Sequence, residues 1–400
     1  MRNKIILLVI VFSNSIYANF NFNKDLSLKK VDKDILSESI TNHVFASDGW
    51  PKSVEIENRV YQIEYSLNEK LENYIQKELK RYGTSYTSIV VIDNNNGSIV
   101  TAIDYAGKSR TFNKNLTFSS TNPAASIFKV VTAAELIENT KVNENTQFSY
   151  NGRSSTLYKY QLKENKNKWT RDIPLSRAFA SSNNVVFAKA AMQNTDWDGL
   201  TKMANRFGFN QPLMQMLDVG SSKLFSDNDT FGLAELASGF NRKTLMSPLH
   251  GAIIASIVAN DGVLLKPSII SSVKDVSLDR LVWKPKYIAE RIFSTKTASE
   301  MQDMMELTVK RGTARGAFRP WKIKALKNIR LGGKTGSITG GLPYGKRDWF
   351  VSYAKPEDSN DKGISICVMI VNEKKWYIKS TEIARNVMNY YYKEIKKSEI

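Results

Sequence analysis

The stretch NPAASIFKVVTAAELIEN, residues 122–139, places a serine and a lysine three positions apart at the start of an otherwise apolar helical pattern. Positions i and i+3 lie on one face of a helix, so the amine of Lys129 can reach the hydroxyl of Ser126. Pro123 indicates that Ser126 lies in the first turn, where free N–H groups and the helix dipole favour a developing negative charge. Burial among apolar neighbours lowers the pKa of a lysine and leaves some of it uncharged. The stretch therefore predicts a serine nucleophile with a lysine as its base.

The Ser-x-x-Lys spacing is a weak indication by itself. It recurs at Ser27–Lys30, Ser271–Lys274, Ser352–Lys355 and Ser359–Lys362. The prediction for Ser126 and Lys129 therefore depends on two further motifs later in the chain.

One of these motifs is LGGKTGSITGG, residues 331–341. It is not a phosphate-binding loop of the Walker A type, because Asn328 stands where that motif needs a glycine. A β-strand is the better interpretation.

In such a strand, Lys334 and Gly336 point to one face, while Thr335 and Ser337 point to the other. Gly336 lets a substrate approach the backbone closely. Lys334 supplies a cation, and the hydroxyl and N–H groups can hold a carboxylate or an oxyanion. An edge strand with a solubilising lysine is the alternative for this motif taken alone.

The other motif is the Ser-x-Asn of AFASSNNVVFAKAA, formed by Ser182 and Asn184 in a turn before a predicted helix. Ser181 and Asn183 give a competing register. Taken alone, either pair is explained by an ordinary helix N-cap.

In this order, S-x-x-K, S-x-N and K-T-G-S resemble the motifs of the penicillin-binding protein transpeptidase domain. The resemblance runs from about Asn68 to the C-terminus. It includes the segments VVIDNNNGSIVTAI, SPLHGAIIASIVANDG, VKRGTA and DWFVSYA. The phrase VVFAKAA after the second motif favours the register with Ser182 and Asn184.

The resemblance implies four catalytic residues. Ser126 would attack a D-alanyl-D-alanine stem peptide and become acylated, with Lys129 as its base. Ser182 would help to pass the proton to the leaving D-alanine, and Lys334 would set the local electric field.

The resemblance also implies four residues that bind the substrate. Asn184 would hold a substrate amide, and Gly336 would allow close approach. Thr335 and Ser337 would grip the terminal carboxylate, and the N–H groups of Ser126 and Ser337 would form the oxyanion hole.

The implied function is that of a peptidoglycan D,D-transpeptidase or D,D-carboxypeptidase that β-lactams inhibit covalently. Its partners would be stem peptides and β-lactams, with a cell-wall synthesis complex as a further candidate. A serine β-lactamase and a non-catalytic β-lactam or muropeptide sensor stay open as alternatives. Against the β-lactamase, no class A deacylating glutamate motif is found, and Asn184 stands where class D enzymes usually have Val or Ile.

The net charge of +18 raises the question of nucleic-acid binding. The chain has no zinc-finger spacing and no aromatic RNA-binding signature, so we expect no nucleic-acid partner. A basic surface attracted to anionic envelope polymers is the better interpretation. His43 and His250 show no metal-ligand spacing, and we expect neither a metal nor another cofactor. The single cysteine, Cys367, lies in an apolar run typical of a core strand.

Residues 1–18 are predicted to be a signal peptide. Arg2 and Lys4 precede an apolar run, and Ala18 is a cleavage point. Retention of this segment as an anchor is the alternative. The protein would then be exported in a bacterium, to the periplasm or the outer face of the cytoplasmic membrane. Residues 19–67 are interpreted as a polar N-terminal extension, and residues 68–400 as the transpeptidase domain.

The remaining pattern predicts an α/β fold. A helix with Leu71, Ile75 and Leu79 on one face precedes a hairpin of SIVVID and SIVTAID around an Asn/Gly turn. A mainly helical insertion follows over residues 105–325, then three strands and a closing helix. We therefore expect a central antiparallel sheet flanked by helices, as in β-lactamases and transpeptidases.

Overall fold

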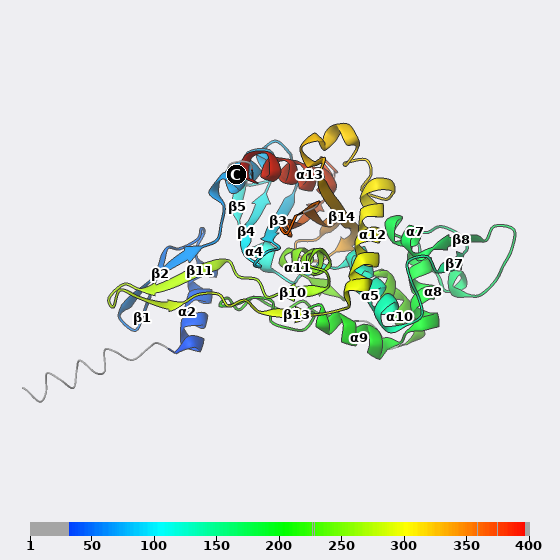
Figure 1. The fold of residues 1–400 in the computed structure, drawn as a ribbon, viewed down its shortest axis with the longest axis horizontal. Coiled ribbons are helices and arrows are strands. Elements are labelled where there is room, and N and C mark those ends of the chain that lie inside the picture. The colour runs from blue at the N-terminus through cyan, green and yellow to red at the C-terminus, as the bar shows by residue number, and fades with distance from the viewer. Residues whose placement is uncertain (1–31, 226, 228, 358, 374, 397–400) are drawn as a thin grey trace, which may run out of the picture.

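The computed structural model describes residues 32–396, except residues 226, 228, 358 and 374 (Figure 1). The predicted signal peptide and the first part of the predicted extension lie outside the described residues.

The centre of the molecule is an antiparallel sheet, as the sequence predicts. Within the described residues it has six strands, and its order places the first strand of the predicted hairpin beside the strand that comes last in the sequence. In spatial order the strands are β14 (Ile329–Gly340), β15 (Gly345–Pro356), β16 (Ile364–Asn372), β3 (Tyr86–Asp93), β4 (Ile99–Ala106) and β5 (Thr111–Asn113). The predicted hairpin and the three predicted C-terminal strands are therefore confirmed, and β14 lies at one edge.

Both faces of this sheet are covered by helices, so its strands are apolar on both sides. On β16, Ile366 and Val368 face a core with α3 and α13, whereas Cys367 and Met369 face a core with α5, α11 and α12. The helices of the first face are α3 (Glu69–Lys80) and α13 (Ser380–Tyr390), which continues as the π-helical turn η4 (Tyr391–Ile395). The helices of the second face are α5 (Lys129–Asn139), α11 (Pro248–Ala259) and α12 (Thr295–Arg311).

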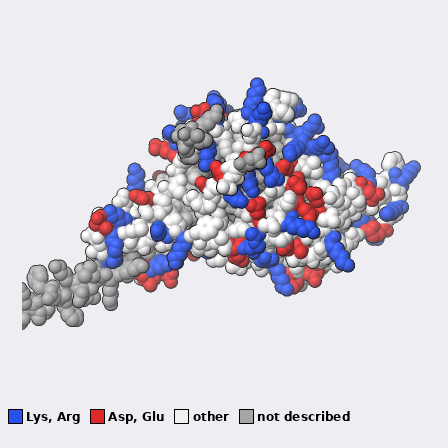
Figure 2. Space-filling view, viewed as in Figure 1, with Lys and Arg blue, Asp and Glu red and all other residues white. Residues whose placement is uncertain are grey.

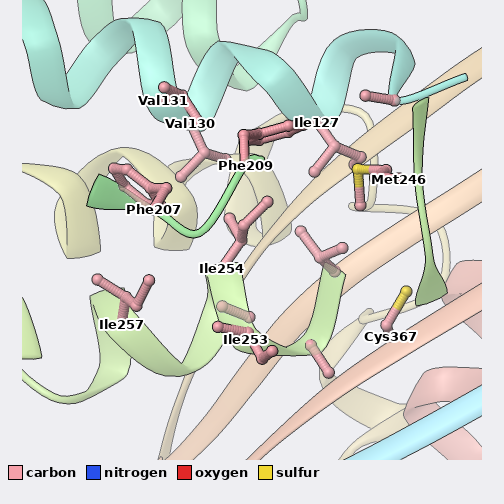
Figure 3. Close-up of a cluster of buried hydrophobic side chains, with 14 of the residues drawn as sticks. Ile127, Val130, Val131, Phe207, Phe209, Met246, Ile253, Ile254, Ile257 and Cys367 are labelled. Atoms are coloured by element: carbon pink, nitrogen blue, oxygen red, sulfur yellow. The ribbon is translucent and has the colours of Figure 1, made fainter. Parts of the chain in front are cut away.

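The second face holds the core that supports the Ser126 segment (Figure 3). There α5 and α11 lie on either side of a layer of apolar side chains. The labelled members are Ile127, Val130, Val131, Phe207, Phe209, Met246, Ile253, Ile254, Ile257 and Cys367. A Cβ at Gly251 would lie 2.7 Å from the Sγ of Cys367, so the glycine lets α11 approach the sheet closely. Cys367 is buried core, in agreement with its sequence pattern.

The insertion between β5 and β14 is mainly helical, as predicted. Besides α5, α11 and α12, it contains α4 (Asn115–Phe118), α6 (Lys159–Leu162), α7 (Leu175–Ala180), α8 (Asn184–Asn194), α9 (Trp197–Arg206) and α10 (Thr230–Ser238). Its 3₁₀ turns are η1 (Ala125–Phe128), η2 (Pro320–Lys322) and η3 (Lys324–Leu326). Short ladders join β6 (Asn122–Pro123) to β9 (Leu245–Met246), β7 (Gln147–Tyr150) to β8 (Arg171–Pro174), and β10 (Val263–Leu265) to β13 (Ala289–Arg291).

A second sheet was not predicted, and it lies at the opposite end of the molecule from β7 and β8 (Figure 1). It has the order β1 (Ser53–Ile56), β2 (Arg59–Tyr65), β11 (Ile270–Asp275) and β12 (Arg280–Trp283). Residues 263–291 were predicted to belong to the mainly helical insertion, but they form the strands β10 to β13 instead. Among these strands, β11 pairs with β2, about 200 residues earlier, and no local pattern reveals that pairing. The other strands are three or four residues long and pair within the segment, β12 with β11 and β10 with β13.

The predicted extension thus contains helical and strand structure from Lys33 onwards. Besides β1 and β2 it forms α2 (Lys33–Ala46), whose Leu36, Ile40 and Val44 are buried. The boundary at residue 67 stays a prediction, since β2 belongs to a sheet completed by the later part of the chain. None of the helices in the described part combines the length and the apolar character needed to cross a membrane.

Candidate active site

Ser126 lies on a strained turn rather than in the first turn of an α-helix. Residues 125–128 form the 3₁₀ turn η1, and α5 begins only at Lys129. Ala125 has a φ of 51°, a left-handed conformation that costs energy for an L-residue. A Cβ at Gly239 would lie 2.0 Å from the carbonyl oxygen of Ala125, so only glycine fits beside this turn. The turn leaves Ser126 half-buried, while Ile127 and Phe128 anchor it in the core.

Lys129 is fully buried and has three hydrogen-bond partners. Its Nζ lies 2.9 Å from the Oγ of Ser126 and donates to the Oδ1 of Asn184 at 2.7 Å and to the carbonyl oxygen of Ser238. Its ammonium group would have no carboxylate in contact among the described residues. Burial, and then the nearby Lys334, hold the pKa of Lys129 well below its usual range.

The partners of Lys129 fix where its protons lie. Ser238 and Asn184 present carbonyl oxygens, which only accept, so they take two of the N–H groups. An uncharged amine has two N–H groups and one lone pair, and the lone pair is then left facing the hydroxyl of Ser126. The site is therefore arranged for Ser126 to donate its proton to Lys129.

The structure brings Ser182 and Asn184 to the two lysines and turns Ser181 away. Ser182 has a φ of 56° and accepts a hydrogen bond from the Nζ of Lys334 at 2.9 Å. Ser181 is exposed and donates to the backbone oxygen of Arg177 at 2.8 Å. Asn183 caps α8 by accepting from the N–H of Val186.

Asn184 uses both ends of its amide within the protein. Its Oδ1 accepts from Lys129, and its Nδ2 donates to the carbonyl oxygen of Ser155 at 3.0 Å. These contacts orient Lys129, whereas the predicted role of holding a substrate amide stays a prediction.

Lys334 is the second fully buried lysine. Its Nζ donates to Ser182 and, at 2.8 Å, to the carbonyl oxygen of Thr335, and it lies 5.5 Å from the ring centroid of Phe179. Burial lowers the pKa of Lys334 to about 7. Part of this lysine therefore keeps its charge at neutral pH.

The motif strand β14 presents an open edge of the sheet beside η1. A Cβ at Gly336 would lie 3.2 Å from the side chain of Ile127, so the glycine allows the strand and the turn to approach. Ser337 is exposed, and Thr335 is half-buried with its Oγ1 2.6 Å from that of Thr313. An unpaired strand edge with two hydroxyls can bind an extended peptide.

Three contributors to the site were missed by sequence reasoning. Ser238 supplies a backbone oxygen, for which the sequence carries no signal, because any residue has one. Gly239 is the left-handed C-cap of α10, and a glycine that follows an apolar helical run is a recognisable signal. Thr313 lies within VKRGTA, a segment that was noted only for its resemblance.

Among the described residues, carboxylates and metal ligands are absent from the site. No Asp or Glu side chain hydrogen-bonds to Ser126, Lys129, Ser182 or Lys334 within the part of the chain that the structure describes. Over the same residues, no group of three or more His, Cys, Asp or Glu side chains could hold a metal ion. His250 is buried, bonds the backbone oxygen of Phe207 at 2.9 Å and has its pKa lowered to about 4, so it is a core residue.

A half-buried serine hydroxyl beside a buried lysine of low pKa, with a second lysine on an edge strand, is the arrangement of a serine acyl-transfer site. The fold places this site between a helical region and the edge of an antiparallel sheet (Figure 1).

Comparison with known families gives the particular class. The sequence model of the penicillin-binding protein transpeptidase domain matches residues 87–389. The chain belongs to this family, as the three motifs predicted.

Known relatives and structures agree with this assignment. The peptidoglycan D,D-transpeptidase PbpA of Mycolicibacterium smegmatis is 24% identical over 267 residues, which are 64% of this chain and 51% of PbpA. The chain thus matches about half the length of this relative. The D,D-transpeptidase domain of a peptidoglycan glycosyltransferase from Eggerthella lenta has a TM-score of 0.63, with 22% identity and 83% of each chain covered. Penicillin-binding protein A of Mycobacterium tuberculosis, in a ceftriaxone acyl-enzyme complex, has a TM-score of 0.62, with 18% identity over 87% of this chain and 82% of that chain.

Proposed function

We propose that the protein is a serine D,D-transpeptidase or D,D-carboxypeptidase that acts on D-alanyl-D-alanine stem peptides and is acylated by β-lactams. The observation that carries the proposal is the 2.9 Å contact between the Nζ of Lys129 and the Oγ of Ser126, in an amine whose other partners are two acceptors. Ser126 is then a nucleophile that Lys129 activates, and no histidine is needed.

In the acylation step, Ser126 gives its proton to the lone pair of Lys129 while its Oγ attacks the carbonyl carbon of the penultimate D-alanine. The oxyanion forms against the N–H groups of Ser126 and Ser337, and each such donor typically contributes about 3 kcal/mol to lowering the barrier. The C–N bond then breaks as the leaving amine takes a proton. Ser182, held by Lys334, is placed to relay that proton.

Substrate binding follows from the edge strand. An extended peptide can add along β14, where Gly336 leaves the backbone accessible. Its terminal carboxylate would meet the hydroxyls of Thr335 and Ser337, in a site that Lys334 makes electropositive. The acyl-enzyme is released by an amine of a second stem peptide in transpeptidation, or by water in carboxypeptidation.

A serine β-lactamase is the alternative with the same first step. Rapid hydrolysis of the acyl-enzyme needs a base that activates water. No carboxylate lies against Ser126 or Lys129 in the described part of the chain, and this favours a long-lived acyl-enzyme. A relative named as a D,D-transpeptidase and a fold neighbour described as a ceftriaxone acyl-enzyme also favour it. With this function the protein would be exported and act on the cell wall, with a synthesis complex as a candidate partner.

The test is the intact mass of the protein after addition of benzylpenicillin, followed over hours. We expect a persistent adduct of one β-lactam per chain, and none in Ser126→Ala with its fold checked by circular dichroism. An adduct that disappears while the antibiotic is consumed would make the protein a β-lactamase. No adduct at all would leave a non-catalytic binding protein.

A further inference from the structure

A cationic pocket lies beside the candidate active site, at the start of α7 and the end of α12. It has a volume of about 660 Å³, and Arg177, Lys310, Arg311 and Arg315 line it together with Ser176. All four cations are exposed. We call this group of four side chains the cationic pocket.

Among the described residues, three of the four cations of this pocket have no carboxylate as an ion-pair partner. Lys310 pairs with Glu306 at 2.8 Å. Within the described residues, no carboxylate forms an ion pair with Arg177, Arg311 or Arg315. From Leu307 to Arg347 the sequence contains neither Asp nor Glu. Figure 2 shows the result as Lys and Arg atoms along the upper edge of the molecule, over the end of α12 and the segment after it.

A purely structural explanation covers only part of this pocket. Lys310 and Arg311 occupy the last turn of α12, where cations favourably meet the helix dipole. Arg177 comes from α7, and Arg315 lies beyond the end of α12. Like charges that converge from separate elements repel one another unless an anion lies between them.

The pocket is joined to the active site through short backbone links. Arg177 and Ser182 lie on either side of the end of α7, and Arg177 donates to the backbone oxygen of Arg311 at 3.3 Å. Thr313 donates its N–H to the backbone oxygen of Ala180 at 3.0 Å, while its Oγ1 contacts that of Thr335. Thr313 and Ser181 are both exposed, so an accessible rim connects the pocket to the hydroxyls of the site.

We propose that the cationic pocket binds a carboxylate of the peptidoglycan strand, beyond the part of the stem peptide that reacts at Ser126. This inference rests on the proposed function. Arginine presents a planar fork of donors that matches a carboxylate with two parallel hydrogen bonds, and three arginines meet here. The pocket then acts as a second point of attachment, which raises the effective concentration of the strand at the site. A small β-lactam reaches Ser126 without using it.

The experiment compares two double variants that remove the same charge. Arg311→Gln with Arg315→Gln changes the pocket, and Arg280→Gln with Lys284→Gln changes exposed cations on and just after β12 in the second sheet. The probe is purified peptidoglycan stripped of phosphate polymers, and binding is measured by co-sedimentation at low ionic strength. The same peptidoglycan with its carboxylates amidated is the second arm.

We expect the pocket variant to bind on the order of tenfold more weakly than the wild type, with the control within twofold. Amidation should weaken wild-type binding to the level of the pocket variant. Benzylpenicillin adducts should form at the same rate in all three proteins.

Equal binding by the two double variants would overturn the inference, as would binding that amidation leaves unchanged. A difference seen only with peptidoglycan that keeps its phosphate polymers would replace the carboxylate by a phosphate. Loss of the benzylpenicillin adduct in the pocket variant alone would show that these residues support the fold of the site. Loss of the adduct in the wild type would instead contradict the proposed function.

Discussion

The candidate active site and the second sheet treat buried charge in opposite ways. In the second sheet, the side chain of Asp275 is buried to 1% exposure, and it lies 3.6 Å from Arg59 and accepts from the N–H of Leu278. In the active site, Lys129 and Lys334 are fully buried and contact only uncharged acceptors within the described residues. Both regions join segments that are far apart in the sequence. Among the described residues, Asp275 of the second sheet faces a counterion, whereas Lys129 and Lys334 do not.

This difference indicates that the buried charge of the second sheet stabilises the fold, whereas the buried lysines of the candidate active site lower stability and serve the proposed chemistry. Burial of an unpaired cation is unfavourable, so the pKa of the group falls and it loses its proton more readily. For a lysine this loss produces a base at neutral pH, which a paired lysine would not provide. Substitutions in the two regions test this contrast, and those in the candidate active site should have the largest effects.

Removal of the Lys129 amine should have the largest effect. Lys129→Met is expected to slow acylation by benzylpenicillin about 1,000-fold, or about 4 kcal/mol, because Ser126 loses its proton acceptor. Stopped-flow or quenched-flow mass measurements give the rate constant. Lys129→Arg is the matched control, since it keeps a cation that cannot accept a proton, and it should be as slow. An active Arg variant would mean that charge, rather than proton transfer, is what Lys129 supplies.

Ser182→Ala should slow acylation about 100-fold, which corresponds to a barrier higher by about 3 kcal/mol. The variant lacks the hydroxyl that Lys334 holds in place as a proton relay. Ser181→Ala is the matched control and should stay within a few-fold of the wild type, since the hydroxyl of Ser181 donates to the backbone oxygens of Arg177 and Ala178 in α7. The reverse ranking would select the competing register.

Lys334→Met should stabilise the protein at low pH. The folded pKa of Lys334 is about 7, below the ordinary value of 10.5. Below pH 7 the folded state therefore bears the full free-energy cost of burying the charged amine. This cost decreases as the pH rises towards 10.5. The variant also loses the two hydrogen bonds of the amine, which offsets part of the gain. We therefore expect its free energy of unfolding at pH 6 to be about 2 kcal/mol higher than that of the wild type.

Urea unfolding at pH 6 and at pH 10 measures this gain, which should shrink or vanish at pH 10. Lys77→Met, at an exposed position of α3, is the control for loss of a surface lysine. A gain that does not change with pH would show that Lys334 is not held below its usual pKa.

Asp275→Asn should affect stability alone. The amide keeps an acceptor for Leu278 and loses the charge that faces Arg59, so we expect a loss of roughly 1 kcal/mol in the free energy of unfolding. The acylation rate of the folded protein should stay within twofold. A large fall in that rate would mean that the second sheet is coupled to the active site.

The sequence predicted the central sheet because its elements are local. The alternation in SIVVID and the helical spacing of Leu71, Ile75 and Leu79 require only neighbouring residues. The strands from β10 to β13 were missed because they are only three to six residues long, and because β11 also depends on β2, which is distant in the sequence. The pairing of β11 with β2 is the clearest case, since neither strand indicates the other.

For the candidate active site, the residue types and their order could be predicted from the sequence, but their contacts could not. It placed Ser126 in the first turn of an α-helix, whereas the chain forms a 3₁₀ turn with Ala125 in a left-handed conformation. The backbone oxygen of Ser238 was not foreseen, because an oxygen that every residue carries leaves no trace in the sequence. The contact of Asn184 with Lys129 joins two helices and also follows only from the tertiary structure.

The most direct test of a neutral Lys129 is the pH dependence of acylation by benzylpenicillin. The first-order rate constant at saturating antibiotic separates the proton transfer from binding, which Lys334 also influences. We predict that this rate constant rises with pH to a plateau with a midpoint well below 10.5, because burial lowers the pKa of Lys129. A rate constant that rises only with a midpoint near 10.5 would show that Lys129 is an ordinary charged lysine, and would contradict the account.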